Sequence, residues 1–109
     1  MVRRFESAFA ECVGTKFAVA VNSCTAALHL SMRALNIGPG DEVIVPDLTF
    51  AATANAAVFC GAKPVFADVD EETFNISPER VLEKITSKTK AIIPFLIVRI
   101  LCSKLIKIL

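Results

Sequence analysis

Short β-favouring runs alternate with helical segments along most of this 109-residue chain, and this alternation restricts the fold more than any other feature. Apolar residues recur at helical spacing in four segments, and the runs between them are rich in Val and Ile. The expected helices span residues 3–13, 25–36, 49–59 and 78–85, and the expected strands span residues 17–21, 42–45, 64–69 and 91–94. The pattern predicts an α/β fold with a mostly parallel sheet covered by helices on both faces, in three layers.

Turn residues mark the ends of several of these elements. The sequence Gly-Pro-Gly-Asp at residues 38–41 separates the second helix from the second strand, Gly61 ends the third helix, and Ser77 is expected to cap the fourth. Residues 1–95 contain no internal repeat and no linker, so we expect one domain there. Residues 96–109 form a tail of a different, Ile/Leu/Lys-rich composition.

A polar Ser-Cys-Thr turn lies between the expected strand 17–21 and the helix that follows it. Backbone N–H groups in the first turn of a helix lack intrahelical partners, and the helix dipole makes that end attractive to an anion. The hydroxyls of Ser23 and Thr25 could add side-chain donors. Ser and Thr are also ordinary helix caps, so these residues alone leave both phosphate binding and simple capping open.

Four ordered blocks of sequence carry a resemblance to a known family. They read NSCTAALHL, IGPGDEVIVP, LTFAATANA and KPVFADVDEETFNI. Together, from about Arg3 to Pro94, the chain resembles the DegT/DnrJ/StrS family of pyridoxal-phosphate-dependent sugar aminotransferases. The resemblance implies that residues 1–95 are part of the large, cofactor-binding domain of a fold-type-I transferase, and that residues 96–109 are a divergent tail.

The resemblance assigns contacts with pyridoxal 5'-phosphate to five positions, which are Ser23, Cys24, Thr25, Ala26 and Phe50. The first four match the loop that holds the cofactor phosphate at the start of a helix. Many relatives carry Gly where this chain has Cys24, which is still small enough for close backbone approach. Phe50 matches an aromatic position whose ring stacks on the pyridine ring. Taken alone, Phe50 would be an ordinary core phenylalanine.

Both assigned positions follow strands at their carboxyl ends, where parallel sheets place their ligands. We therefore expect the Ser-Cys-Thr turn and Phe50 to share one crevice. Asp47 and Asn55 could face the same crevice. A helix-cap role for Asp47 and a helix-surface role for Asn55 are equally good interpretations.

By resemblance, two further blocks complete the chemistry, namely a Schiff-base lysine and an Asp with a nearby Gln that hold the pyridine nitrogen. Neither block is present in the 109 residues. Lys84, Lys88 and Lys90 are poor substitutes, since residues 86–90 read as a solvated turn before a strand, and none of the three is assigned to catalysis. The resemblance also implies a segment before Met1 and stops at about Phe95, where the tail reads like an out-of-frame translation. We therefore expect a fragment that is inactive alone.

The resemblance also defines the parent reaction and its partners. It moves an amino group from an amino acid to a keto group on a nucleotide-linked sugar, in a homodimer. In the parent fold, the first strand pairs with later strands that these residues do not encode. We therefore expect an exposed apolar edge at residues 17–21.

Composition argues against several other classes of protein. The net charge of +1, without a basic face interleaved with aromatic residues, gives no case for nucleic-acid binding. His29 is the single histidine, so a multi-histidine metal site is excluded. Four widely spaced cysteines without a secretory signal indicate reduced thiols in the cytoplasm. The acidic run at residues 68–72 lacks the Gly and final Glu of a calcium loop, so we expect a solvated turn.

A non-catalytic interaction protein is the alternative. It could pair with a full-length homologue, since the parent family builds its active sites at dimer interfaces. It could also bind a membrane surface, because residues 97–109 carry a basic amphipathic pattern. Charges interrupt that pattern too often for a segment that spans a membrane.

Overall fold

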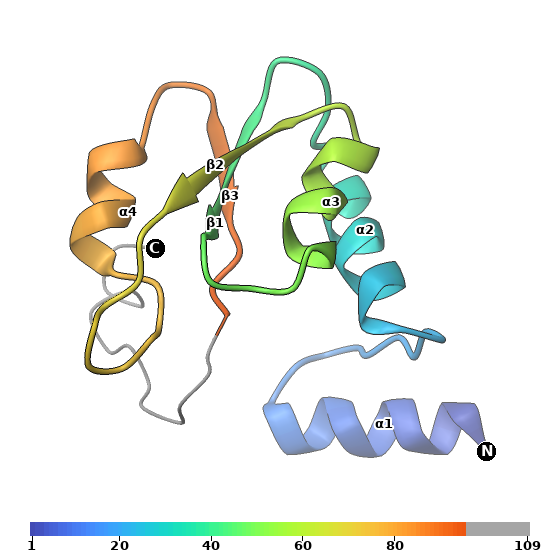
Figure 1. Cartoon of the computed structure of the whole chain (residues 1–109). Helices are drawn as coiled ribbons and strands as arrows, with labels where there is room; N and C mark the ends of the chain where they lie inside the picture. The colour runs from blue at the N-terminus through green and yellow to red at the C-terminus, as the bar shows by residue number, and fades with distance from the viewer. Residues whose placement is uncertain (96–109) are drawn as a thin grey trace.

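The computed structural model describes residues 1–95 and contains a three-stranded parallel sheet with strand order β2-β1-β3. The central strand is β1 (Glu42–Pro46), and it pairs in parallel with both β2 (Lys63–Ala67) and β3 (Thr89–Ile92). Figure 1 shows the three strands running in the same direction through the middle of the molecule. The parallel sheet confirms the α/β prediction.

Helices cover the two faces of this sheet. On one face lie α2 (Cys24–Ala34) and α3 (Ala52–Phe59), which pack against each other, and on the other face lies α4 (Pro78–Lys84). The expected three-layer arrangement is therefore present (Figure 1).

The alternation of side chains along β1 explains why the sheet needs helices on both sides. Val43 and Val45 pack with Met32 and the small residues of α3, whereas Ile44 packs on the opposite face with Val81 of α4. All three β1 side chains are fully buried. A strand buried on both faces reads as a continuous apolar run, which is how residues 43–46 look in the sequence.

Local signals mark the start of α4 and the end of α3 as expected. The Ser77 hydroxyl accepts a hydrogen bond from the Arg80 N–H at 3.4 Å, and Pro78 occupies the first turn of α4. Gly61 follows α3 with φ 77°, in the left-handed region that favours glycine. The third helix starts at Ala52, three residues later than expected, because residues 47–51 form a loop.

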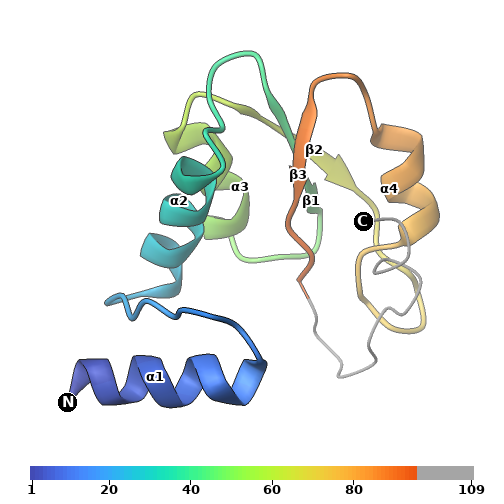
Figure 2. The same cartoon turned by 180° about the vertical axis from the view of Figure 1, so that it is seen from behind.

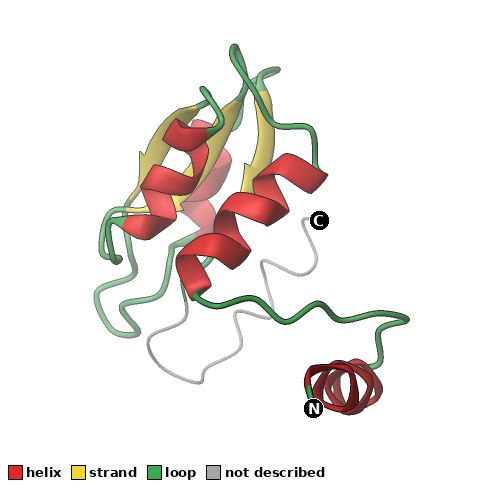
Figure 3. Ribbon diagram, turned by 90° about the vertical axis from the view of Figure 1, so that its right-hand side faces the viewer, coloured by secondary structure: helices red, strands yellow, loops and turns green. Residues whose placement is uncertain are grey.

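The first helix, α1 (Val2–Val13), lies apart from the layered body at the end of an extended connection (Figures 2 and 3). Its Glu6 carboxylate accepts a hydrogen bond from the Ala20 N–H at 2.9 Å, which ties the connection to the helix. The apolar side of α1 is largely open, since Phe5 and Phe9 are 60% and 50% exposed.

The strand predicted at residues 17–21 is wrong. The segment is extended, but within residues 1–95 no strand pairs with it. A β-strand is completed by a hydrogen-bonding neighbour, and sequence preference cannot supply one. Phe17 and Val19 are consequently 77% and 79% exposed, which confirms the expected exposed apolar segment.

Candidate functional site

Ser23 caps the start of α2. Its backbone is extended, with φ −158° and ψ 156°, and its hydroxyl accepts a hydrogen bond from the Ala26 N–H at 3.1 Å. Its carbonyl accepts the Ala27 N–H at 3.0 Å. The capping interpretation therefore describes the geometry of the helix start. The Ala27 bond is the first regular bond of the helix, and the Ser23 hydroxyl pairs one of the N–H groups that the helix leaves without a partner, that of Ala26.

Capping leaves further donors at the same helix start. The N–H groups of Cys24 and Thr25 lie in the first turn, where the helix provides no acceptor. Ser23, Cys24 and Thr25 are exposed and Ala26 is half-buried. No acidic side chain is present in this first turn to repel an anion. Two free N–H groups, an exposed hydroxyl and the positive end of the helix dipole suit the phosphate end of a cofactor.

Phe50 lies in the loop between β1 and α3 and is 76% exposed. The interpretation of Phe50 as a core residue is therefore wrong. Small residues of α3, including Ala56 and Ala57, pack in the core cluster instead, together with Val43 and Val45. An exposed ring is available for stacking on a flat ligand, and that role stays a prediction.

The chain brings these two positions to the same end of the sheet. The carboxyl end of β1, the loop that carries Phe50 and the starts of α2 and α3 all lie at the lower end of the layered body in Figure 1. The two helices pack against each other, and both begin at this end. This is the end at which parallel sheets bind their ligands.

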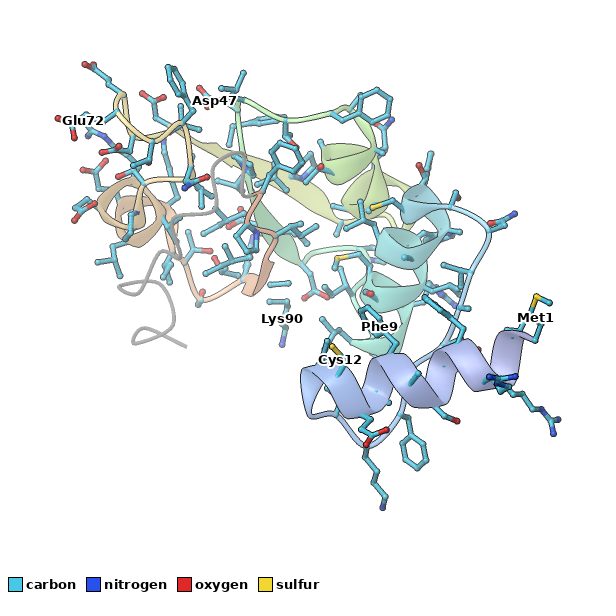
Figure 4. All side chains as sticks on the ribbon, turned by 90° about the horizontal axis from the view of Figure 1, so that it is seen from below. Met1, Phe9, Cys12, Asp47, Glu72 and Lys90 are labelled. Carbon is cyan, nitrogen blue, oxygen red and sulfur yellow. The ribbon has the colours of Figure 1, made fainter. Side chains whose placement is uncertain are left out.

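Asp47 belongs to a different part of this edge. Its N–H donates to the Ala67 carbonyl at 3.1 Å, and its side chain lines a hollow of about 320 Å³ together with Asp68, Arg80 and Lys84. Figure 4 places Asp47 toward the loop that carries Glu72. The predicted helix-cap role is wrong, because the residue that precedes α3 is Ala51, without a side-chain cap.

The other polar residues considered in the sequence lie on helix surfaces, between helices or on the exposed surface. Asn55 is exposed on α3, as the helix-surface interpretation predicts. His29 contacts the Phe59 ring edge-on at 5.8 Å between centroids and so joins α2 to α3. Lys84, Lys88 and Lys90 are all exposed, and Lys90 lies on β3. In the described part of the chain, no group of three or more metal-binding side chains is assembled.

The acidic run forms the expected turn. One oxygen of Asp70 accepts hydrogen bonds from the Thr73 N–H and hydroxyl, both at 2.9 Å, and from the Glu72 N–H at 3.2 Å. These donors, led by the Thr73 backbone, lower the pKa of Asp70 below its ordinary value. Asp70 therefore holds the turn between β2 and α4.

Two threonines near Phe50 form a polar pair that the sequence pattern did not reveal. The hydroxyls of Thr49 and Thr53 lie 2.8 Å apart, and Thr53 is buried, at 6% exposure. The sequence does contain two threonines four residues apart near the start of a helix. This spacing predicts a contact only when the first residue of the helix is known.

None of the helices within residues 1–95 is both long enough and apolar enough to cross a membrane. The amphipathic pattern predicted for the tail lies outside the described residues.

A family model described as the DegT/DnrJ/EryC1/StrS aminotransferase family matches residues 1–98. Among curated proteins, the chain is 57% identical over 93 residues to the spore coat polysaccharide biosynthesis protein SpsC of Bacillus subtilis. That match covers 85% of this chain and 24% of SpsC. The chain is also 53% identical over 90 residues to GDP-perosamine synthase of Caulobacter vibrioides, with coverage of 83% and 24%.

Solved structures give the same picture. The chain superposes with a TM-score of 0.80 on the PLP form of the putative sugar aminotransferase Spr1654 from Streptococcus pneumoniae, at 40% identity. The match covers 84% of this chain and 23% of that one. The chain therefore spans about a quarter of the length of the relatives it matches.

Proposed function

Since the chain belongs to the DegT/DnrJ/EryC1/StrS aminotransferase family, we propose that its residues provide the phosphate- and ring-binding part of a pyridoxal-phosphate-dependent sugar aminotransferase. The reaction would transfer an amino group from an amino acid to a keto group on a nucleotide-linked sugar. The observation that carries the proposal is the exposed first turn of α2 beside the Phe50 loop, at the carboxyl end of the sheet.

At the phosphate end, the N–H groups of Cys24 and Thr25 and the Thr25 hydroxyl would donate to phosphate oxygens. The Ser23 hydroxyl accepts the Ala26 N–H, so its own proton is available to another acceptor. In the structure the hydroxyl donates this proton to the Asn22 side-chain oxygen at 3.4 Å, a long hydrogen bond that a bond to a phosphate oxygen would replace.

At the ring end, Phe50 would lie against the face of the pyridine ring and orient it. Such a contact contributes about 0.5–1.5 kcal/mol beyond the area it buries. When bound, the cofactor supplies an electron sink for carbanion chemistry. The role of these residues is to hold it at the sheet edge in a defined orientation.

The proposed site is incomplete within these 109 residues. The chemistry needs a lysine amine to bond the cofactor and a carboxylate to keep its ring nitrogen charged, and the residues at the α2 start and around Phe50 provide neither. We propose that residues 1–95 form part of a cofactor-binding domain, followed by a divergent tail, and that this polypeptide alone binds without turnover. Its free thiols, Cys12, Cys24 and Cys60, suit a cytoplasmic location.

Binding is tested with pyridoxine 5'-phosphate, which has no aldehyde and so cannot react with surface lysines. Titration calorimetry should show saturable binding that inorganic phosphate competes away and that Phe50→Ala weakens. Absence of binding, or binding that phosphate does not reduce, would contradict the proposal.

The proposal that this polypeptide does not turn over has its own test. Incubation with pyridoxal 5'-phosphate, an amino-acid donor and a nucleotide-linked keto-sugar should give no transamination. Transamination accompanied by a borohydride-trapped adduct at one specific lysine would refute it.

A second candidate function is a non-catalytic partner of a full-length homologue. The exposed apolar segment at residues 17–21 favours it, because apolar hollows of about 470 Å³ and 440 Å³ flank that segment, toward α1 and α2. Co-purification with a full-length homologue, and its loss in the Val19→Lys variant, would support pairing through this segment.

Membrane binding by the tail is tested separately. Liposome flotation compares the whole chain with a version that ends at Pro94.

A further inference from the structure

Phe50 is held between two threonines that bond to each other. The Thr49 and Thr53 hydroxyls are 2.8 Å apart, and the Phe50 carbonyl accepts the Thr53 N–H at 2.9 Å. Thr53 is 6% exposed and Thr49 is half-buried, so water competes little for this hydroxyl pair. Residues 49–53 therefore form a turn closed by two hydrogen bonds. The backbone of Phe50 is part of this turn.

This turn is the point at which the loop becomes helix α3. The residue before α3, Ala51, has no side chain that could cap the helix. The hydroxyl pair joins the loop to the first turn of the helix through side chains. At its other end the loop is anchored to β2, because the Asp47 N–H donates to the Ala67 carbonyl at 3.1 Å.

The position of Phe50 needs such restraint. A large apolar side chain at 76% exposure gains free energy by folding back onto apolar neighbours. Half-buried and exposed apolar side chains lie nearby on the same loop and helix, including Leu48 and Ala54. A loop fixed at both ends denies Phe50 the backbone movement that this collapse requires.

We propose that Thr53 is a positioning residue for Phe50, which it holds at the sheet edge through its hydroxyl bond to Thr49. This inference rests on the proposed function, because it takes Phe50 to be the ring-stacking residue. Thr53 does not touch the cofactor in this account. Its effect reaches the ligand only through the ring.

Two substitutions of Thr53 separate positioning from packing. Thr53→Val keeps the size and β-branching of the side chain and removes the hydroxyl, whereas Thr53→Ser keeps the hydroxyl and removes the methyl group. Thr49→Val breaks the same bond from the loop side, at a half-buried position where an unfolded product is less of a risk. All variants are compared with Phe50→Ala.

The measurement is the affinity for pyridoxine 5'-phosphate relative to that for inorganic phosphate. Loss of the stacking contribution lowers the affinity for pyridoxine 5'-phosphate by roughly two- to twelvefold. Thr53→Val and Thr49→Val should lower it by the same factor as Phe50→Ala, and Thr53→Ser should restore it. Phosphate affinity should stay constant throughout, because the start of α2 is untouched. A ligand-free readout is hydrogen exchange at the Thr53 amide, which should speed up in Thr53→Val and not in Thr53→Ser.

The outcomes distinguish failure of the inference from failure of the proposed function. Equal wild-type affinity for the two ligands, or no binding of either, would overturn both. A wild-type preference for pyridoxine 5'-phosphate that Phe50→Ala removes and Thr53→Val and Thr49→Val leave intact would overturn the inference alone. Equal loss in Thr53→Ser and Thr53→Val would also overturn it, because packing rather than the hydroxyl would then be responsible.

Discussion

Substitution of Ser23 separates the capping role that the structure shows from the phosphate-binding role that we propose. Asp and Asn cap helices about as well as Ser, whereas Ala does not. Ser23→Asp should therefore preserve the bond to the Ala26 N–H, which is 3.1 Å long with serine, while it places a negative charge at the proposed phosphate site. Ser23→Asn is the matched control, with the same shape and no charge.

The magnitudes follow from the exposed position of Ser23. Removal of the cap in Ser23→Ala should lower the free energy of unfolding by about 1 kcal/mol, within a usual range of about 0.5–2. A carboxylate about 4 Å from a phosphate repels it by about 1 kcal/mol per pair of unit charges in water, and the phosphate carries about −1.5 to −2. Phosphate affinity should thus fall roughly ten- to thirtyfold in Ser23→Asp.

Circular dichroism during urea unfolding gives the stabilities, and calorimetric titration with inorganic phosphate gives the affinities. We expect Ser23→Asp and Ser23→Asn to be as stable as the wild type, with affinity lost only in Ser23→Asp. If both variants bind phosphate as the wild type does, the start of α2 is only a capped helix end and the cofactor assignment there is wrong.

Three further predictions concern stability and association. Ile44→Ala should cost about 2–5 kcal/mol in urea unfolding, because the side chain is fully buried against α4, and a loss below about 1 kcal/mol would contradict that packing. Asp70, whose pKa lies below its ordinary value of 3.8, should stabilise the fold above that pH, and its contribution should disappear as the pH falls through the lowered pKa. Urea unfolding between pH 2 and 6 should therefore show a flatter profile in Asp70→Asn, and an unchanged profile would argue against this turn. Phe17→Glu combined with Val19→Lys should reduce self-association in sedimentation velocity, because both apolar side chains are more than three-quarters exposed. Self-association equal to that of the wild type would show that another surface mediates it.

Much of the fold could be predicted because its signals are local. The apolar run at residues 43–46 reflects burial on both faces, and Ser77 with Pro78 marks the start of α4 whatever the rest of the chain does. Residues 17–21 show where this approach fails. Their composition favours a strand, but a strand also depends on a neighbour, and no other strand within residues 1–95 pairs with them.

The candidate site could be predicted only in part, for a similar reason. The Ser23 cap follows from residue type and position. The exposure of Phe50 depends on the path of the loop between β1 and α3, and the Thr49–Thr53 bond depends on where α3 begins. Both are set by tertiary packing, which a residue-by-residue reading does not contain.

Amide and aromatic NMR spectra recorded during titration with pyridoxine 5'-phosphate test the proposed site most directly. We expect saturable shifts of the Cys24, Thr25 and Ala26 amides together with the Phe50 ring. Inorganic phosphate should shift the same amides and leave the ring unchanged. Saturable shifts confined to other residues, or no shifts at all, would contradict the assignment of a cofactor site to this edge of the sheet.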